Sequence, residues 1–148
     1  FLSDTDLILK HATVANLHWD IECEDNVFAL FKNSQDAIFS LHSSATQWKH
    51  KFLLELIFEN GYLILDGILS QTMSYAPEKL IKARKNKDAN LAMGSLPEQV
   101  MIFDKDESWK RELIDFIDCI KHKKEVKNGS IDDAMNVLSL IEKIYNKK

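Results

Sequence analysis

The chain has 148 residues, of which 45% are hydrophobic and 28% are charged, the composition of an ordinary globular protein. With only four glycines and two prolines, it cannot be a collagen-like or mucin-like chain, and its apolar content excludes a disordered one. The net charge is −4, and Arg84 and Arg111 are the only arginines, so the composition argues against nucleic acid as a partner.

No stretch of the sequence approaches the roughly 18 uninterrupted apolar residues of a membrane span, and no secretory leader opens the chain. We therefore expect a cytoplasmic protein without a membrane partner. Cys23 and Cys119 lie far apart and form no CxxC pair. They are expected to be two free, buried thiols.

Alternating apolar and polar residues predict a series of consecutive antiparallel strands in the first part of the chain. Asn60-Gly61 is a strong hairpin signal between two of them. Two shorter apolar segments, 79–85 and 99–103, bring the expected total to about six to eight strands. The other predicted strands cover residues 7–19, 26–32, 37–47, 51–59 and 62–68.

The period of the apolar residues changes to that of a helix after Asp104. One apolar stripe runs from Trp109 to Ile120. Another runs from Ala134 to Tyr145, behind a capping box that starts at Ser130. Strands followed by helices predict an α+β fold. We expect one domain over residues 1–148, in which a largely antiparallel open sheet carries the C-terminal helices on one face.

Motifs that bind nucleotides or activate nucleophiles are missing from the sequence. The glycines at positions 61, 67, 94 and 129 form neither a GxGxxG nor a GxxxxGK[ST] loop, and no GxSxG elbow occurs. We expect no catalytic residue, no cofactor site and no metal site in this chain. The alternative is a metal site formed by His42, His50 and Asp66, if these side chains converge in the fold.

One cluster of residue types is typical of carbohydrate contact, because aromatic faces stack on sugar rings while lysine and imidazole donate hydrogen bonds to hydroxyls or phosphate. It consists of Trp48, Lys49 and His50, and Tyr75 is a further candidate. The alternative is an edge tryptophan that caps the core between solvated neighbours. A second candidate set is the hydroxyl- and histidine-bearing face of residues 37–47, which would line a pocket or form an interface. Its members are Ser40, His42, Ser44 and Thr46.

An ordered series of short motifs resembles the C-terminal domain of the glucose–fructose oxidoreductase / inositol dehydrogenase / MocA family, and it covers nearly the whole chain from about residue 5. The order of the motifs along the chain carries the resemblance. The motifs are Glu24-Asp-Asn26 before an apolar strand; Gln47-Trp48-Lys49 before Phe52, Glu55, Phe58, Gly61 and Leu63; Ser74-Tyr75; Asp106-x-Ser108-Trp109 with Glu112 and Phe116; Gly129-Ser-x-x-Asp133-Ala134; and Leu138-x-x-Ile141-x-x-Ile144-Tyr145.

The resemblance implies an NAD(P)-dependent oxidoreductase in which an N-terminal Rossmann domain binds the cofactor and this domain supplies the substrate pocket and the oligomer interface. The Glu-Lys-Pro and Asp-x-Gly-x-His-x-x-Asp motifs of the family do not occur here, and Phe1 would follow just after the second. The chain departs from the family at Ala76, where similar sequences often have glycine, and this departure puts the role of Tyr75 in question.

The expected function is therefore that of a fragment: the substrate-binding and oligomerisation domain of a dehydrogenase acting on a sugar, a sugar derivative or a cyclitol. Its expected partners are the missing Rossmann domain and further copies of itself, bound through the open sheet face. NAD or NADP would be bound by the full-length protein only, and this chain alone would be inactive. The alternative is a stand-alone, non-catalytic α+β module for binding or dimerisation.

Overall fold

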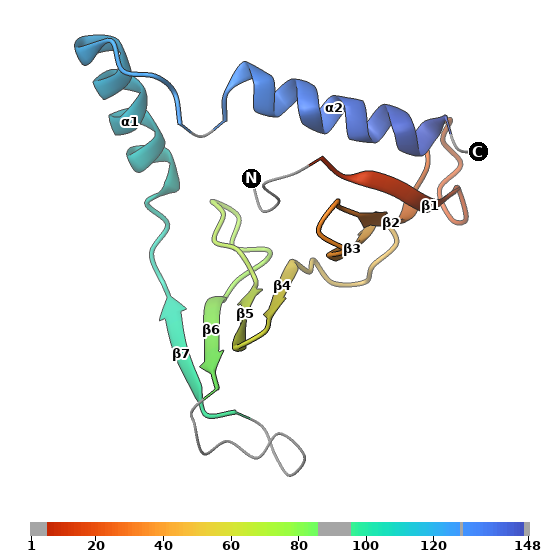
Figure 1. Ribbon diagram of the computed structural model, residues 1–148, viewed down its shortest axis with the longest axis horizontal. Coiled ribbons are helices and arrows are strands. Elements are labelled where there is room, and N and C mark those ends of the chain that lie inside the picture. The colour runs from red at the N-terminus through yellow and green to blue at the C-terminus, as the bar shows by residue number, and fades with distance from the viewer. Residues whose placement is uncertain (1–5, 86–95, 128, 147–148) are drawn as a thin grey trace. The chain divides into compact units, whose positions relative to one another are not determined.

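Seven strands and two helices follow one another along the chain in the computed structural model, which describes residues 6–85, 96–127 and 129–146 (Figure 1). The α+β class predicted from the sequence is confirmed: the strands are antiparallel and both helices come last. The strands are β1 (Ile8–Ala15), β2 (Asn26–Lys32), β3 (Ile38–Ser44), β4 (Leu53–Phe58), β5 (Gly61–Asp66), β6 (Glu78–Arg84) and β7 (Glu98–Phe103); the helices are α1 (Ser108–His122) and α2 (Ile131–Tyr145).

The described strands form two sheets instead of one continuous sheet. β1-β2-β3 make a three-stranded sheet and β4-β5-β6-β7 make a four-stranded sheet. The chain also divides into two compact units. The terminal unit comprises residues 1–47 and 118–148, and the central unit comprises residues 48–117.

The core of the terminal unit lies between its sheet and α2. Helix α2 runs along β1 (Figure 1), and Ile144 is buried with three sheet residues, Leu9, Ala29 and Phe31. Leu140 packs against the same cluster, although it lies outside the stripe that helical spacing predicted. Leu138, which belongs to the predicted stripe, is exposed instead. The face of α2 that meets the sheet is therefore narrower than its apolar stripe.

A β-bulge in β1 sets which residues face this core. The pairing with β2 shifts between Leu9 and His11. One extra residue at this point reverses the alternation of side chains. As a result Leu9 lies on the same side of the sheet as Ala12 and Val14, which pack against the core cluster.

Strand β1 ends at Ala15, four residues before the predicted end of the strand at 19. The backbone N–H groups of Leu17, His18 and Trp19 donate to the carboxylate of Asp25 and not to a neighbouring strand. Because the Asp25 side chain accepts these hydrogen bonds, the three N–H groups do not pair with a neighbouring strand, and the chain turns away from the sheet.

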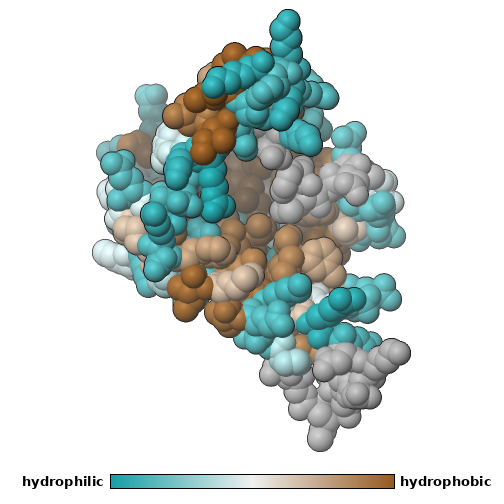
Figure 2. All heavy atoms as spheres, turned by 90° about the vertical axis from the view of Figure 1, so that its left-hand side faces the viewer, coloured by the Kyte–Doolittle hydropathy of each residue, from teal (hydrophilic) through white to brown (hydrophobic). Residues whose placement is uncertain are grey.

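The central sheet is a single layer in which Gly67 and Ala83 are the only buried residues among those described in the unit. One face is leucine-rich, because the register of the four strands places Leu54, Leu65, Leu80 and Met101 in one row. Figure 2 views the molecule from the side of β7 and α1 and shows hydrophobic side chains gathered on the surface there. The exposed large hydrophobic residues of β7 and α1 are Val100, Met101, Ile102, Phe103, Trp109, Leu113, Ile114, Phe116, Ile117 and Ile120.

Candidate functional site

The structure brings His50 and Tyr75 together in the central unit. The N–H of Gly67 donates to the carbonyl of Phe52 at 2.9 Å, and the N–H of Ile68 donates to the carbonyl of Tyr75 at 3.2 Å. The first bond extends the pairing of β4 and β5 beyond the strands, and the second joins the segment after β5 to the loop that carries Tyr75. The His50 and Tyr75 rings lie side by side, with their centroids 4.9 Å apart and their planes tilted by 52°. Two of the four residues predicted to contact substrate therefore share one site.

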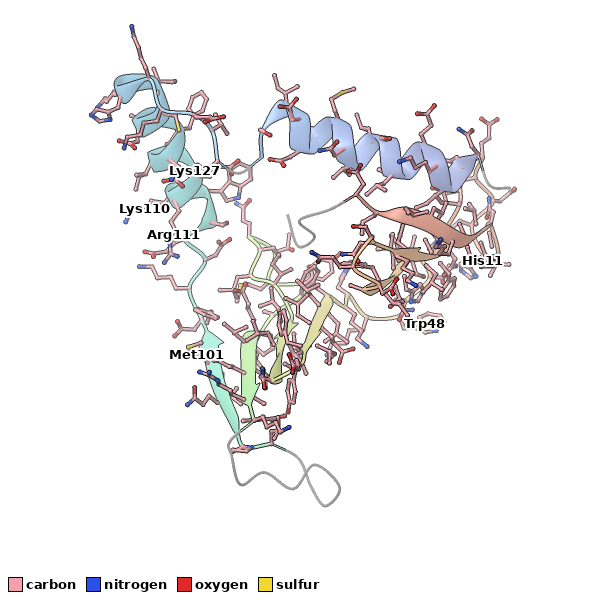
Figure 3. All side chains as sticks on the ribbon, in the orientation of Figure 1. His11, Trp48, Met101, Lys110, Arg111 and Lys127 are labelled. Carbon is pink, nitrogen blue, oxygen red and sulfur yellow. The ribbon has the colours of Figure 1, made fainter. Side chains whose placement is uncertain are left out.

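Trp48 is fully exposed and does not cap the core. Figure 3 shows its side chain projecting from the segment between β3 and β4. Lys49 beside it is exposed as well. A tryptophan that capped the core would have most of its surface covered by neighbouring residues. The alternative that Trp48 is such a capping residue is therefore wrong. Both residues are open to a ligand.

The loop that carries Tyr75 is fixed at both ends. Leu69 N–H donates to the Glu78 carboxylate at 2.8 Å, and Met73 N–H donates to the Ser70 carbonyl at 2.9 Å. Gly67 has a φ of +79°, and a Cβ there would lie 2.0 Å from the carbonyl oxygen of Pro77. Only glycine fits between these backbones, which makes Gly67 a support of the site that sequence patterns did not single out.

The same loop presents a row of hydroxyl groups. The Thr72 hydroxyl lies 2.8 Å from that of Ser74 and 3.3 Å from that of Ser70. The Ala76–Pro77 peptide bond, which closes the loop, is cis. Tyr75 lies beside His50 even with alanine at position 76, in a loop that is rich in hydrogen-bonding groups.

Ser44 and Thr46, two of the second candidate set, belong to a hydrogen-bonded cluster in the terminal unit. Their hydroxyl oxygens lie 2.9 Å apart, and the Thr46 N–H donates to the Ser44 hydroxyl at 3.0 Å. The Asn26 amide donates to the Thr46 hydroxyl at 3.1 Å. The arrangement fixes the chain where β3 ends, a structural role that the sequence pattern did not reveal.

Asp25 is the centre of this cluster and is only 3% exposed. Its carboxylate accepts from His18 N–H at 2.7 Å, Leu17 N–H at 3.0 Å and Trp19 N–H at 3.1 Å. Burial acts to raise the pKa of Asp25, but the hydrogen bonds from His18, from the Asn26 side chain and from the other two N–H groups outweigh it and hold the pKa far below its usual range. A charged Asp25 is thus built into the fold of the loop.

Ser40 and His42 lie on the exposed side of β3, away from the core. The His42 ring stacks on Phe28 of β2, with centroids 4.1 Å apart and planes 11° from parallel. This stacked pair is an exposed aromatic platform on the terminal sheet.

A pocket of about 360 Å³ lies in the terminal unit at the end of β1. Two of its lining residues are hydrogen-bonded to each other: the Tyr145 hydroxyl donates to Glu24, and this hydrogen bond raises the pKa of Tyr145. Cys23 in the pocket wall is exposed and Cys119 is half-exposed, so the expectation of two buried thiols is wrong; both are free. The lining residues are Val14, Ala15, Asn16, Glu22, Cys23, Glu24 and Tyr145.

The N-terminus of each helix carries a carboxylate that accepts hydrogen bonds there, whereas a helix N-terminus that binds phosphate presents free N–H groups. Asp106 already accepts from Ser108 N–H at the start of α1, and Asp133 completes the capping box of α2. Gly94 lies outside the described residues. Within the described ranges no group of three or more His, Cys, Asp or Glu side chains is placed to hold a metal ion.

No family model, no curated protein and no solved structure matches this chain. Among the described residues, neither helix is long and apolar enough to cross a bilayer.

Proposed function

We propose that this chain is the substrate-binding and oligomerisation domain of an NAD(P)-dependent oxidoreductase that acts on a sugar, a sugar derivative or a cyclitol, similar to the glucose–fructose oxidoreductase / inositol dehydrogenase / MocA family. The observation that carries the proposal is the ordered series of motifs from Glu24 to Tyr145 on an α+β fold of antiparallel strands followed by two helices.

The residues proposed for substrate contact are Trp48, Lys49, His50 and Tyr75. The adjacency of His50 and Tyr75 supports them, because an imidazole and a phenol side by side offer hydrogen-bond donors and acceptors to sugar hydroxyls. The exposed ring of Trp48 offers a face for stacking. These groups would bind and orient the substrate. A carbinol substrate would lose a hydride and a proton, and the nicotinamide cofactor that accepts the hydride would be held by the Rossmann domain.

The Rossmann domain would come from coding sequence upstream of Phe1, and the assembled enzyme would work in the cytoplasm. The test is to isolate the gene with that upstream sequence, purify its product and follow NAD+ or NADP+ reduction with a panel of aldoses, uronates and inositols. We expect turnover with at least one of them. An upstream sequence without a glycine-rich strand–helix unit and without Glu-Lys-Pro would refute the proposal.

A second measurement separates this domain from a complete enzyme. The 148-residue chain alone is titrated with NADH while the nicotinamide fluorescence is recorded. We expect no saturable change, because the caps of α1 and α2 place carboxylates where a pyrophosphate would lie. Tight binding by the chain alone would contradict the assignment of the cofactor site to another domain.

A further inference from the structure

The apolar stripe of α1 lies uncovered on the surface of the chain. Trp109, Leu113, Phe116 and Ile117 share one side of the helix, and their side chains are 76%, 57%, 61% and 40% exposed. No residue of α1 is buried. Within the described ranges α2 packs along β1, whereas α1 packs along no strand. Because helices in proteins are stabilised mainly by packing of their apolar face, this stripe needs a surface to cover it.

The leucine-rich face of the central sheet is an apolar surface of matching size. Strand pairing adds Leu56 and Leu63 to this face, and Phe103, two residues after Met101, lies on it as well. Among the residues described, no helix packs on this sheet. The 15 residues of α1 span about 22 Å and the six residues of β4 about 20 Å. The helix is therefore about as long as the sheet is deep.

The link between β7 and α1 is short. The Asp106 carboxylate accepts from the Ser108 N–H at 2.9 Å and from the Ser108 hydroxyl at 2.6 Å, at the start of the helix. Only residues 104 and 105 lie between the end of β7 and this capping residue. Short hinges favour the exchange of an element between two copies over its folding back within one copy.

We infer that α1 of one copy docks on the leucine-rich face of a second copy, and that the two copies exchange their helices reciprocally. The inference rests on the oligomerisation part of the proposed function and names the elements that meet. A half-exposed large side chain offers on the order of 100 Å², since a fully buried aromatic one hides about 150–250 Å². Four such side chains on each helix, and a similar area on each sheet, give on the order of 1,600 Å² for the reciprocal pair, the size of a stable interface.

A charge-matched pair of variants of the 148-residue chain tests the helix face. Leu113→Lys and Asp115→Asn each raise the net charge by one at an exposed position, but the two residues lie on opposite sides of α1. Leu113→Lys should weaken the dimer about a hundredfold in analytical ultracentrifugation, because the dimer contains the contact twice and each lost leucine contact costs about tenfold. Asp115→Asn should associate like the unmodified chain. Circular dichroism checks that both variants are folded.

A longer hinge distinguishes exchange from simple docking of two surfaces. Six Gly/Ser residues inserted between Asp104 and Lys105 should let α1 reach its own sheet and convert the dimer to a folded monomer. The same insertion between Glu125 and Val126, in the segment between the helices, is the control and should leave the dimer intact. In a mixed dimer of ¹³C-labelled and unlabelled chains, isotope-filtered NOE spectra should connect the Met101 methyl group of one copy to Leu113 of the other.

Three outcomes overturn the inference. They are equal association of Leu113→Lys and Asp115→Asn, a dimer that persists with the longer hinge, and contacts between Met101 and Leu113 within one copy only. Each of them leaves oligomerisation through another element intact. An unmodified chain that is monomeric at all concentrations refutes both the exchange and oligomerisation. The oxidoreductase proposal fails only on its own test, the coding sequence upstream of Phe1 and the turnover of the whole enzyme.

Discussion

The charged carboxylate of Asp25 fixes residues 16–25, the ten-residue connection between β1 and β2, at the end of the three-stranded sheet. A buried carboxylate is costly unless hydrogen bonds satisfy it. Here three successive backbone N–H groups and the amide of Asn26 do so. Its own backbone is also paired, since Asp25 N–H donates to the Ala15 carbonyl at 3.0 Å. The charge and the path of residues 16–25 are therefore specified together.

The substitution Asp25→Asn should destabilise the chain, because an amide offers one acceptor oxygen and turns its NH2 group toward backbone donors. The pKa of Asp25 is lowered in the folded state, so its stabilisation is complete above the carboxyl pKa of the unfolded chain, about 3.9, and is lost as the pH falls from there through the folded-state pKa. Urea midpoints at pH 7, 5 and 3 should show the gap between the two proteins narrowing below about pH 4. Asp20→Asn, an exposed change in the same loop, is the control and should keep the midpoint. A gap that stays constant with pH would contradict the ionic role.

Two phenylalanines of β2 provide a test of the core at the same scale. Phe31 is 5% exposed and belongs to the core cluster, whereas Phe28 is 51% exposed on the opposite face. Phe31→Ala should cost about 3–5 kcal/mol in the free energy of unfolding. Phe28→Ala should cost less than about 1.5 kcal/mol, since it mainly loses the ring stack with His42. Urea denaturation followed by circular dichroism measures both. Equal losses would mean that the core is not where the sheet and α2 place it.

At the scale of elements, the hairpin between β4 and β5 depends on one glycine. Gly61 has a φ of +148°, and a Cβ there would lie 2.1 Å from the carbonyl oxygen of Ala83 on β6. A side chain would therefore push β6 away and disrupt the pairing of β5 with β6. The Asn-Gly signal in the sequence predicted the turn, but the close approach of a third strand could not be inferred from local sequence.

The variant Gly61→Ala should lose more stability than Gly129→Ala. Gly129 has a φ of +70°, and a Cβ added there would have no atom within 4 Å. Alanine at position 129 should therefore lose only the roughly 1–2 kcal/mol that a left-handed backbone conformation costs a residue with a Cβ. At position 61 the collision with Ala83 adds to a comparable backbone cost. The two unfolding free energies from urea titration decide the point. A smaller loss for Gly61→Ala than for Gly129→Ala would show that β6 does not lie against the turn.

Viewed over the whole molecule, local sequence patterns predicted the strands and helices to within a few residues but predicted their assembly less well. The bulge in β1 makes Leu9 and Ala12 share a face, and no alternation rule anticipates an inserted residue. The end of β1 depends on Asp25, six residues beyond Trp19. At the candidate site, residue types pointed to Trp48 and His50, whereas the partnership of His50 with Tyr75 depends on backbone pairing across the Gly67 loop.

We expect the chain to self-associate through the apolar surface of the central sheet. Its leucine-rich face combines three leucines in one row with Met101 at the edge, and Met101 projects from β7 in Figure 3. The three leucines are half-buried, and Met101 is 48% exposed. Exposed apolar side chains often mark protein interfaces, and we propose a second copy of the chain as the partner, in line with the proposed function. We expect the chain to sediment as a species larger than its 17.1 kDa monomer.

Adjacent residues of β7 can identify the face that is used, because successive side chains of a strand point to opposite sides of the sheet. Met101→Lys places a charge on the leucine-rich face and should shift the protein to the monomer in analytical ultracentrifugation. Ile102→Lys places the same charge on the other face and should leave the association unchanged, provided that circular dichroism shows both variants folded. If Ile102→Lys alone produced the monomer, the opposite face would be the interface. If the unmodified chain were monomeric at all concentrations, no second copy would cover the leucine-rich face. Oligomerisation would then no longer be part of the proposed function.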